Sequence, residues 1–107
     1  RKDAGSFIGP MALESLKNFQ IDTCFMGATG FSAEGLFSSQ NILESEVKKQ
    51  AMRVSRRRIM LVDGSKYGIA AFSVFARPED VNILVTDGTF KDAEKFRALG
   101  IEVLFGD

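Results

Sequence analysis

The sequence predicts an α/β fold, a mostly parallel open sheet with helices on both faces. Apolar runs alternate with helix-patterned segments along 107 residues, a length that suits one domain. Two runs, residues 58–62 and 81–86, are almost continuously apolar, which is typical of parallel strands buried on both faces. Each run ends at an Asp-Gly pair, a strong turn signal.

The first 40 residues predict a short helix, a strand and a long loop. Pro10 suits the first turn of a helix, because the N–H groups there have no intrahelical acceptor. Residues 22–26 (DTCFM) are short and mostly apolar and stop at a glycine, which predicts a strand. Residues 27–40 contain three glycines and several serines, which predicts a loop.

Residues 41–57 carry the clearest helix pattern. Asn41 and Glu44 have the spacing of a capping box at its start. The apolar stripe expected to face the core consists of Leu43, Val47, Ala51 and Val54. Lysines and arginines fill most other positions, several near the C-terminus, where positive charge suits the helix dipole. The apolar run 58–62 then predicts a strand directly after the helix.

The last third of the chain predicts three strands and one helix. Residues 69–76 and 81–86 are expected to be buried strands. Thr89 can cap a helix that extends to a C-terminal stop at Gly100. Residues 101–105 (IEVLF) are the final expected strand.

Composition argues against several classes of function. Lys+Arg and Asp+Glu number 14 each, so the chain lacks the positive excess of a stand-alone nucleic-acid-binding protein. There is no histidine, the commonest general base and metal ligand. Cys24 is the only cysteine, which excludes an internal disulfide or a cysteine-based zinc cluster and is consistent with the cytoplasm. No apolar run approaches the ~20 residues that cross a bilayer, and no cofactor or metal is expected.

Three predicted strands end in polar segments: residues 27–30 (GATG), 63–66 (DGSK) and 87–89 (DGT). The carboxyl ends of parallel strands meet at one edge of a sheet, where α/β proteins bind ligands. Glycines let a backbone approach a ligand closely and offer its N–H groups to phosphate or sugar oxygens. The candidate backbone is that of Gly27, Ala28, Thr29 and Gly30. The alternative is a plain turn between strand and loop.

Four side chains complete the candidate site. Asp63 can accept a hydrogen bond from a sugar hydroxyl, and Asp87 is a further candidate at the third strand end. Lys66 and Lys48 can supply positive charge to a phosphate. The alternatives are a surface turn with an Asx-type hydrogen bond at Asp63 and a solvated helix face at Lys48.

Seven short motifs follow one another along the chain: GPMA, FMGATGFS, GLFSS, ESEVKKQAM, LVDGSKYG, LVTDG and LGIEVL. Each is weak by itself. Their order and spacing, from about Gly9 to Phe105, resemble the C-terminal sensor domain of DeoR-family bacterial transcriptional repressors. The resemblance implies the fold of ribose-5-phosphate isomerase and of the glucosamine-phosphate deaminase and CoA-transferase group.

The resemblance also implies a function and a place in a longer protein. Residues 1–107 are the C-terminal part of the sensor domain, with the N-terminal winged helix-turn-helix and the start of the sensor absent. Such a domain binds a phosphorylated sugar that modulates operator binding by a cytoplasmic repressor of a sugar-metabolism operon. The expected partners are this effector, operator DNA through the absent domain, and further copies of the chain, with no membrane.

The related isomerases bear on catalysis. GATG falls where they carry Gly-Ala-Asp-Glu, so Thr29 and Gly30 replace the acidic pair. Lys48 falls where they place the catalytic glutamate, and a cation cannot act as the base. The resemblance therefore implies a binding domain without catalytic residues. Two alternatives stay open: an isomerase- or deaminase-like enzyme that uses Glu46, and an oligomerisation scaffold without a ligand.

Overall fold

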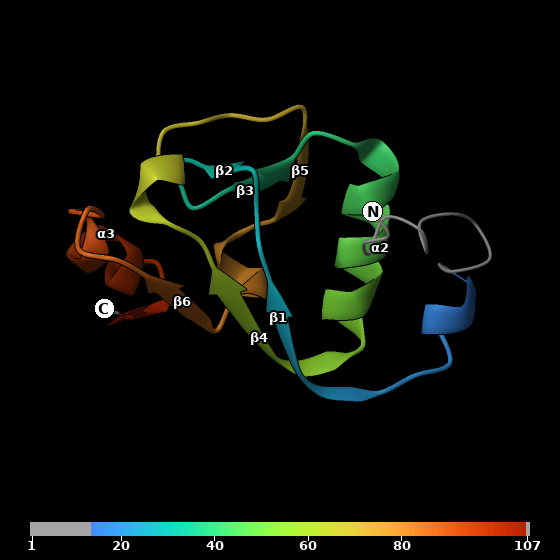
Figure 1. Ribbon diagram of the computed structural model, residues 1–107. Helices are drawn as coiled ribbons and strands as arrows, with labels where there is room; N and C mark the ends of the chain where they lie inside the picture. The colour runs from blue at the N-terminus through green and yellow to red at the C-terminus, as the bar shows by residue number, and fades with distance from the viewer. Residues whose placement is uncertain (1–13, 107) are drawn as a thin grey trace.

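A computed structural model describes residues 14–106 and shows an α/β fold with two sheets (Figure 1). The larger sheet is entirely parallel, in the order β1-β4-β6-β7, and the smaller is antiparallel, in the order β2-β3-β5. The elements are β1 (Ile21–Met26), β2 (Gly30–Phe31), β3 (Phe37–Ser39), α2 (Ile42–Arg53), β4 (Ser55–Leu61), η2 (Gly64–Lys66), β5 (Ser73–Ala76), η3 (Pro78–Asp80), β6 (Ile83–Thr86), α3 (Ala93–Ala98) and β7 (Glu102–Phe105). The α/β class and the mostly parallel sheet are confirmed.

The amino-terminal part agrees with the sequence at β1 and differs in the segment after it. Pro10, which was expected to open a helix, lies outside the described residues. Residues 27–40 were expected to be a loop, but they contain the short strands β2 and β3. Phe37 and Phe31 are fully buried there, and this burial stabilises the two strands. The glycines and serines of the segment had predicted a loop instead.

Helix α2 begins as expected and ends four residues early. The Asn41 side chain accepts a hydrogen bond from the Glu44 N–H, which is half of a capping box. The predicted end at residue 57 is wrong, because Val54 closes the helix and Arg57 already pairs with β1. Arginine is a good helix former, but strand pairing on both sides of β4 outweighs that weak preference.

The buried face of α2 is also rotated from the predicted stripe. Leu43 is exposed, Val47 and Val54 are half-buried, and Ala51 alone of the four is buried. The buried positions of the helix are Ser45, Gln50, Ala51 and Met52.

The predicted strand 69–76 is shorter and joins the other sheet. Only Ser73–Ala76 form β5, antiparallel to β3, while Phe72 is 76% exposed. The Gly68 N–H donates to the Phe31 carbonyl at 2.8 Å, so the segment before β5 runs along β2.

Strands β6 and β7 are confirmed, and helix α3 starts later than expected. Thr89 does not cap it; Asp92 precedes the first helical residue instead. Gly100 has φ of +92°, the left-handed conformation that favours glycine directly after a helix, so the predicted stop is confirmed.

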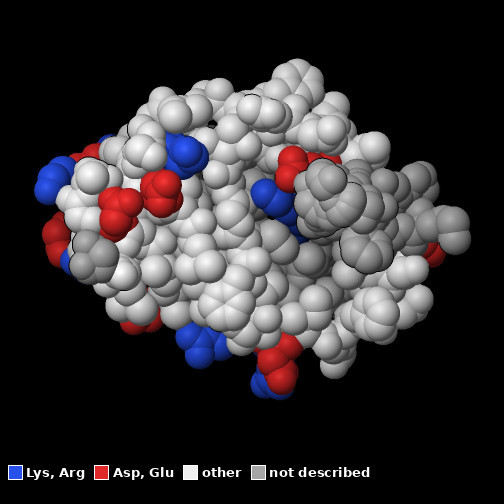
Figure 2. Space-filling model, viewed as in Figure 1, with Lys and Arg blue, Asp and Glu red and all other residues white. Residues whose placement is uncertain are grey.

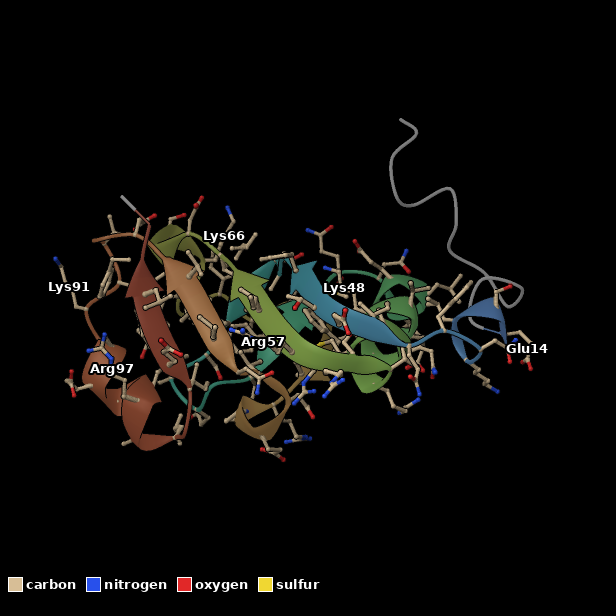
Figure 3. All side chains as sticks on the ribbon, turned by 90° about the horizontal axis from the view of Figure 1, so that it is seen from below. Glu14, Lys48, Arg57, Lys66, Lys91 and Arg97 are labelled. Atoms are coloured by element: carbon tan, nitrogen blue, oxygen red, sulfur yellow. The ribbon has the colours of Figure 1, made fainter. Side chains whose placement is uncertain are left out.

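All three crossovers of the larger sheet advance in the same direction, from β1 to β4, β6 and β7. Right-handed connections then lie on one face of the sheet. That face is buried, with Met60, Leu84 and Phe96 in one core cluster. Figure 3 looks onto the opposite face, with the four strands in front and α2 and the smaller sheet behind. In the described part of the chain, helices therefore cover one face rather than the two that were expected.

The opposite face keeps much apolar surface. Phe25 is 63% exposed, Leu61 46% and Leu104 45%. They lie on β1, β4 and β7, in positions that the strand registers place on the same side of the sheet. We call these three residues the bare face.

Candidate functional site

The loops after β4 and β6 touch one another at the carboxyl edge of the sheet. The Gly64 N–H donates to Asp87 Oδ2 at 3.4 Å. A Cβ atom at Gly64 would lie 2.2 Å from Thr89 Oγ1 and 2.6 Å from the Phe90 nitrogen. Glycine is therefore needed at position 64 because the two loops approach too closely for any side chain.

The loop after β1 joins the same edge through Gly30. A Cβ atom at Gly30 would lie 2.1 Å from the carbonyl oxygen of Ile69, which follows the turn after β4. Gly30 is therefore a packing glycine. Gly27 differs because it is exposed. A Cβ atom added at Gly27 would have the Leu61 carbonyl oxygen as its nearest neighbour, at 3.8 Å. The segments 63–66 and 87–89 thus touch one another, and the GATG segment touches Ile69, three residues beyond the second segment. We call this edge of the sheet the rim.

The backbone of the GATG segment is only partly available to a ligand. The Thr29 N–H donates to the Ser38 carbonyl at 2.9 Å, which ties it to β3. Ala28 packs against the core cluster, and Gly27 is the exposed residue of the four. A ligand contact with this backbone therefore stays a prediction that fits Gly27 best.

Lys48 reaches from α2 to the same loop. Its Nζ donates to the Gly27 carbonyl at 2.8 Å and stands 4.8 Å from the ring centroid of Phe75. Burial lowers the pKa of this ammonium, and the nearby Glu44 carboxylate partly offsets the effect. The half-buried lysine thus links α2 to this loop through a hydrogen bond at the protein surface.

Asp63 and Lys66 stand at the two ends of the η2 turn. The Lys66 N–H donates to the Asp63 carbonyl at 3.0 Å. The carboxylate of Asp63 is exposed and accepts no hydrogen bond from any residue in 14–106, so the alternative Asx-type bond is not formed. Figure 3 shows Lys48 and Lys66 along one edge of the molecule, away from Arg57. Asp63 and Lys66 keep their polar groups available at the rim.

Asp87 is engaged within its own loop. Its carboxylate accepts hydrogen bonds from the Thr89 N–H at 2.9 Å, from the Thr89 hydroxyl and from the Gly64 N–H. The bonds from Thr89 lower the pKa of Asp87, because they stabilise the charged carboxylate. It organises the rim, and its predicted contact with a ligand is the weakest of the set.

Tyr67 and Asp92 form a contact that the sequence did not reveal. The Tyr67 hydroxyl donates to Asp92 Oδ2 at 2.5 Å. Burial, with the Asp92 hydrogen bond and charge, raises the Tyr67 pKa to about 12. The centroid of the Tyr67 ring lies 5.2 Å from that of Phe31 and 4.9 Å from that of Phe90. These aromatic contacts hold the end of the η2 turn against the core. The two partners are 25 positions apart in the sequence, which explains why no local pattern shows their contact.

Two positions that the comparison with the isomerases singled out carry no acid, since Thr29 and Gly30 stand in one and Lys48 in the other. Glu46, the alternative base, pairs with Lys49 at 3.1 Å, whereas Lys48 occupies the position beside Gly27. Within residues 14–106, no cluster of three His, Cys, Asp or Glu side chains is placed to hold a metal ion. In the same range, no helix combines the length and apolar character needed to cross a membrane.

Comparisons with known proteins identify the family. The DeoR C terminal sensor domain matches residues 1–88. The chain is 34% identical over 82 residues to the HTH-type transcriptional regulator YulB of Bacillus subtilis, covering 77% of this chain and 32% of the relative. It is 34% identical over 83 residues to the transcriptional repressor AccR of Agrobacterium fabrum, covering 77% and 32%. It is 29% identical over 97 residues to the HTH-type transcriptional regulator GolR of Listeria innocua, covering 89% and 38%.

These relatives are named as transcriptional regulators, not as enzymes, and this chain spans about a third of their length. The match to the family model agrees with the α/β fold and the parallel sheet described above. The chain therefore belongs to the DeoR family of transcriptional regulators, as a C-terminal sensor domain.

Proposed function

We propose that the rim binds a phosphorylated sugar and that binding modulates the affinity of the complete repressor for operator DNA. The observation that carries this proposal is the contact of Gly64 with the loop after β6 and of Gly30 with Ile69. Gly27, Asp63 and Lys66 belong to the strand-end segments that these contacts involve. Asp63 accepts hydrogen bonds from sugar hydroxyls, and Lys66 supplies a positive charge for the phosphate. The half-buried Lys48 adds a second positive charge beside Gly27.

Operator contact belongs to polypeptide outside these residues. The chain has zero net charge, and Figure 2 shows one face on which charged residues of both signs stand in small groups between large uncharged areas. The face shown there does not attract the DNA backbone. A winged helix-turn-helix elsewhere in a cytoplasmic full-length protein, with the start of the sensor domain, would supply the DNA contact and complete the effector site.

The test is an effector screen on the complete protein. A cognate sugar phosphate should raise the melting temperature and release a labelled operator fragment. Lys66→Gln should weaken effector binding about tenfold or more, because it removes a charge-assisted contact. Lys95→Gln is the matched control, since Lys95 is exposed on α3 and away from the rim. The proposal fails if no sugar phosphate stabilises the protein or if both variants bind equally well.

A second role, self-association, is favoured by the bare face. Its apolar residues on β1, β4 and β7 expose more surface than single scattered side chains do. Light scattering of the complete protein with and without effector tests this role. A monomer under both conditions would exclude it, whereas an oligomer is compatible with effector binding at the rim.

A further inference from the structure

A pocket of about 390 Å³ lies between α2, β4 and β5, away from the rim. Its charged lining residues are Lys49, Arg53, Arg58, Arg77 and Asp80, four cations against one carboxylate. Asp80 precedes β6, whereas Asp87 of the rim follows it, so the pocket and the rim lie at opposite ends of that strand.

Two of the three arginines that line the pocket, Arg53 and Arg58, are held by hydrogen bonds. Arg58 donates from Nε to the Asp80 carbonyl at 2.6 Å and from Nη1 to the Ser55 carbonyl at 2.9 Å. Arg53 Nη1 donates to Gln50 Oε1 at 2.6 Å. These neutral acceptors orient the guanidinium groups and leave their positive charge in place. Within residues 14–106, each guanidinium also keeps N–H groups that donate to no acceptor.

Few carboxylates neutralise the cations that line this pocket. Asp80, the lining carboxylate, accepts from the Arg77 backbone N–H at 3.0 Å. Lys49 pairs with Glu46, whereas the guanidinium groups of Arg53, Arg58 and Arg77 make no ion pair with a carboxylate within residues 14–106. Like charges gathered in one concavity repel, and a bound anion removes that cost.

We propose that this pocket is a second ligand site, which takes a small phosphate-bearing anion. Arginine forks match phosphate oxygens with paired hydrogen bonds. The pocket is concave, and its floor is formed by the buried side chains Met52, Phe75 and Ala76. A concave site with an apolar floor suits a compact organic phosphate rather than the extended backbone of a nucleic acid.

The aromatic ring of Phe75 lies between the pocket and the Lys48 ammonium, which contacts the rim. Phe75 lines the pocket, and the Lys48 ammonium stands 4.8 Å from the centroid of the same ring. That ammonium also holds the Gly27 carbonyl. A ligand that shifts Phe75 therefore acts on the contact that positions the GATG loop.

The test uses inorganic pyrophosphate as the probe, titrated calorimetrically into the complete protein at constant ionic strength, with citrate as a non-phosphate polyanion. Pyrophosphate should bind, and Arg77→Gln should weaken it about tenfold, the loss expected for one charged hydrogen bond. Arg56→Gln is the matched control: it removes one charge from the neighbouring exposed surface of β4 without lining the pocket. It should change the affinity less than about twofold.

Several results would overturn the inference. No pyrophosphate binding to wild-type protein, or equal weakening by Arg77→Gln and Arg56→Gln, would show that the pocket is not a site. Citrate bound as tightly as pyrophosphate would reject the preference for phosphate. Binding abolished by Lys66→Gln but untouched by Arg77→Gln would place the anion at the rim. Thermal unfolding of each variant confirms that a loss of binding is not a loss of fold.

Discussion

Replacing Gly30 by alanine tests the packing at the rim most directly. The new Cβ would lie 2.1 Å from the Ile69 carbonyl oxygen, where ordinary contacts begin at 3.4 Å, so the two segments must separate by about 1.3 Å. The nearby carbonyl carbon, at 2.7 Å, belongs to the same rigid peptide and cannot rotate away. Overpacking against backbone should cost about 3 kcal/mol, the upper end of the usual range.

The assay is thermal unfolding of the complete protein, with Gly88→Ala as the matched control. Gly88 has no atom within 4 Å of a new Cβ, so its substitution should leave stability within about 0.5 kcal/mol. Gly30→Ala should lower the melting temperature of the sensor domain by about 10 °C. Equal melting temperatures for the two variants would refute the idea that Gly30 is required by its contact with Ile69.

Three further predictions concern single groups. Tyr67 is the only tyrosine and there is no tryptophan, so phenolate absorbance should report its pKa of about 12, and Asp92→Asn should lower that value. Because the pKa of Tyr67 in the folded protein exceeds the ordinary 10.0, the protonated hydroxyl stabilises the fold. This stabilisation is complete below pH 10.0 and is lost as the pH rises through about 12. A Tyr67 that titrates at 10.0 would contradict the prediction. Thr86 Oγ1 has no hydrogen-bond partner in the described structure, so Thr86→Val should stabilise the protein by about 1 kcal/mol in urea unfolding, and destabilisation would reveal a missed partner. Lys48→Met should speed several-fold the amide exchange of Thr29, which lies in the loop that Lys48 contacts and whose N–H donates to Ser38, and unchanged exchange would show that the lysine does not hold the loop.

The mostly parallel sheet was predictable because apolar runs mark β1, β4, β6 and β7, and parallel pairing follows from alternation with helices. The order of the strands was not predicted, and the similar run 69–76 ends in the antiparallel sheet. The boundary between α2 and β4 was not predictable either. Arg56 and Arg57 suit a helix end by local preference, and only the pairing partners of β4 place them in a strand.

The location of the candidate site could be predicted from the sequence better than the role of each of its residues. Strand ends with glycines and polar groups pointed to the rim, and the loops after β4 and β6 do touch one another there. Whether Gly30 serves a ligand or packing depends on Ile69, a residue 39 positions later, and the engagement of Asp87 depends on Gly64. Such contacts between distant segments leave no trace in local spacing.

An all-parallel sheet has a consequence for how the chain folds. In the register of β1 with β4, 34 positions separate Ile21 from Ser55, and 24 separate Ile59 of β4 from Ile83 of β6. Each pairing therefore closes a long loop before any hydrogen bond of the ladder forms, which slows folding. During synthesis β1 stays without its partner until β4 has left the ribosome. That interval exposes an apolar strand to other nascent chains, so the yield of native protein should fall with expression rate and temperature.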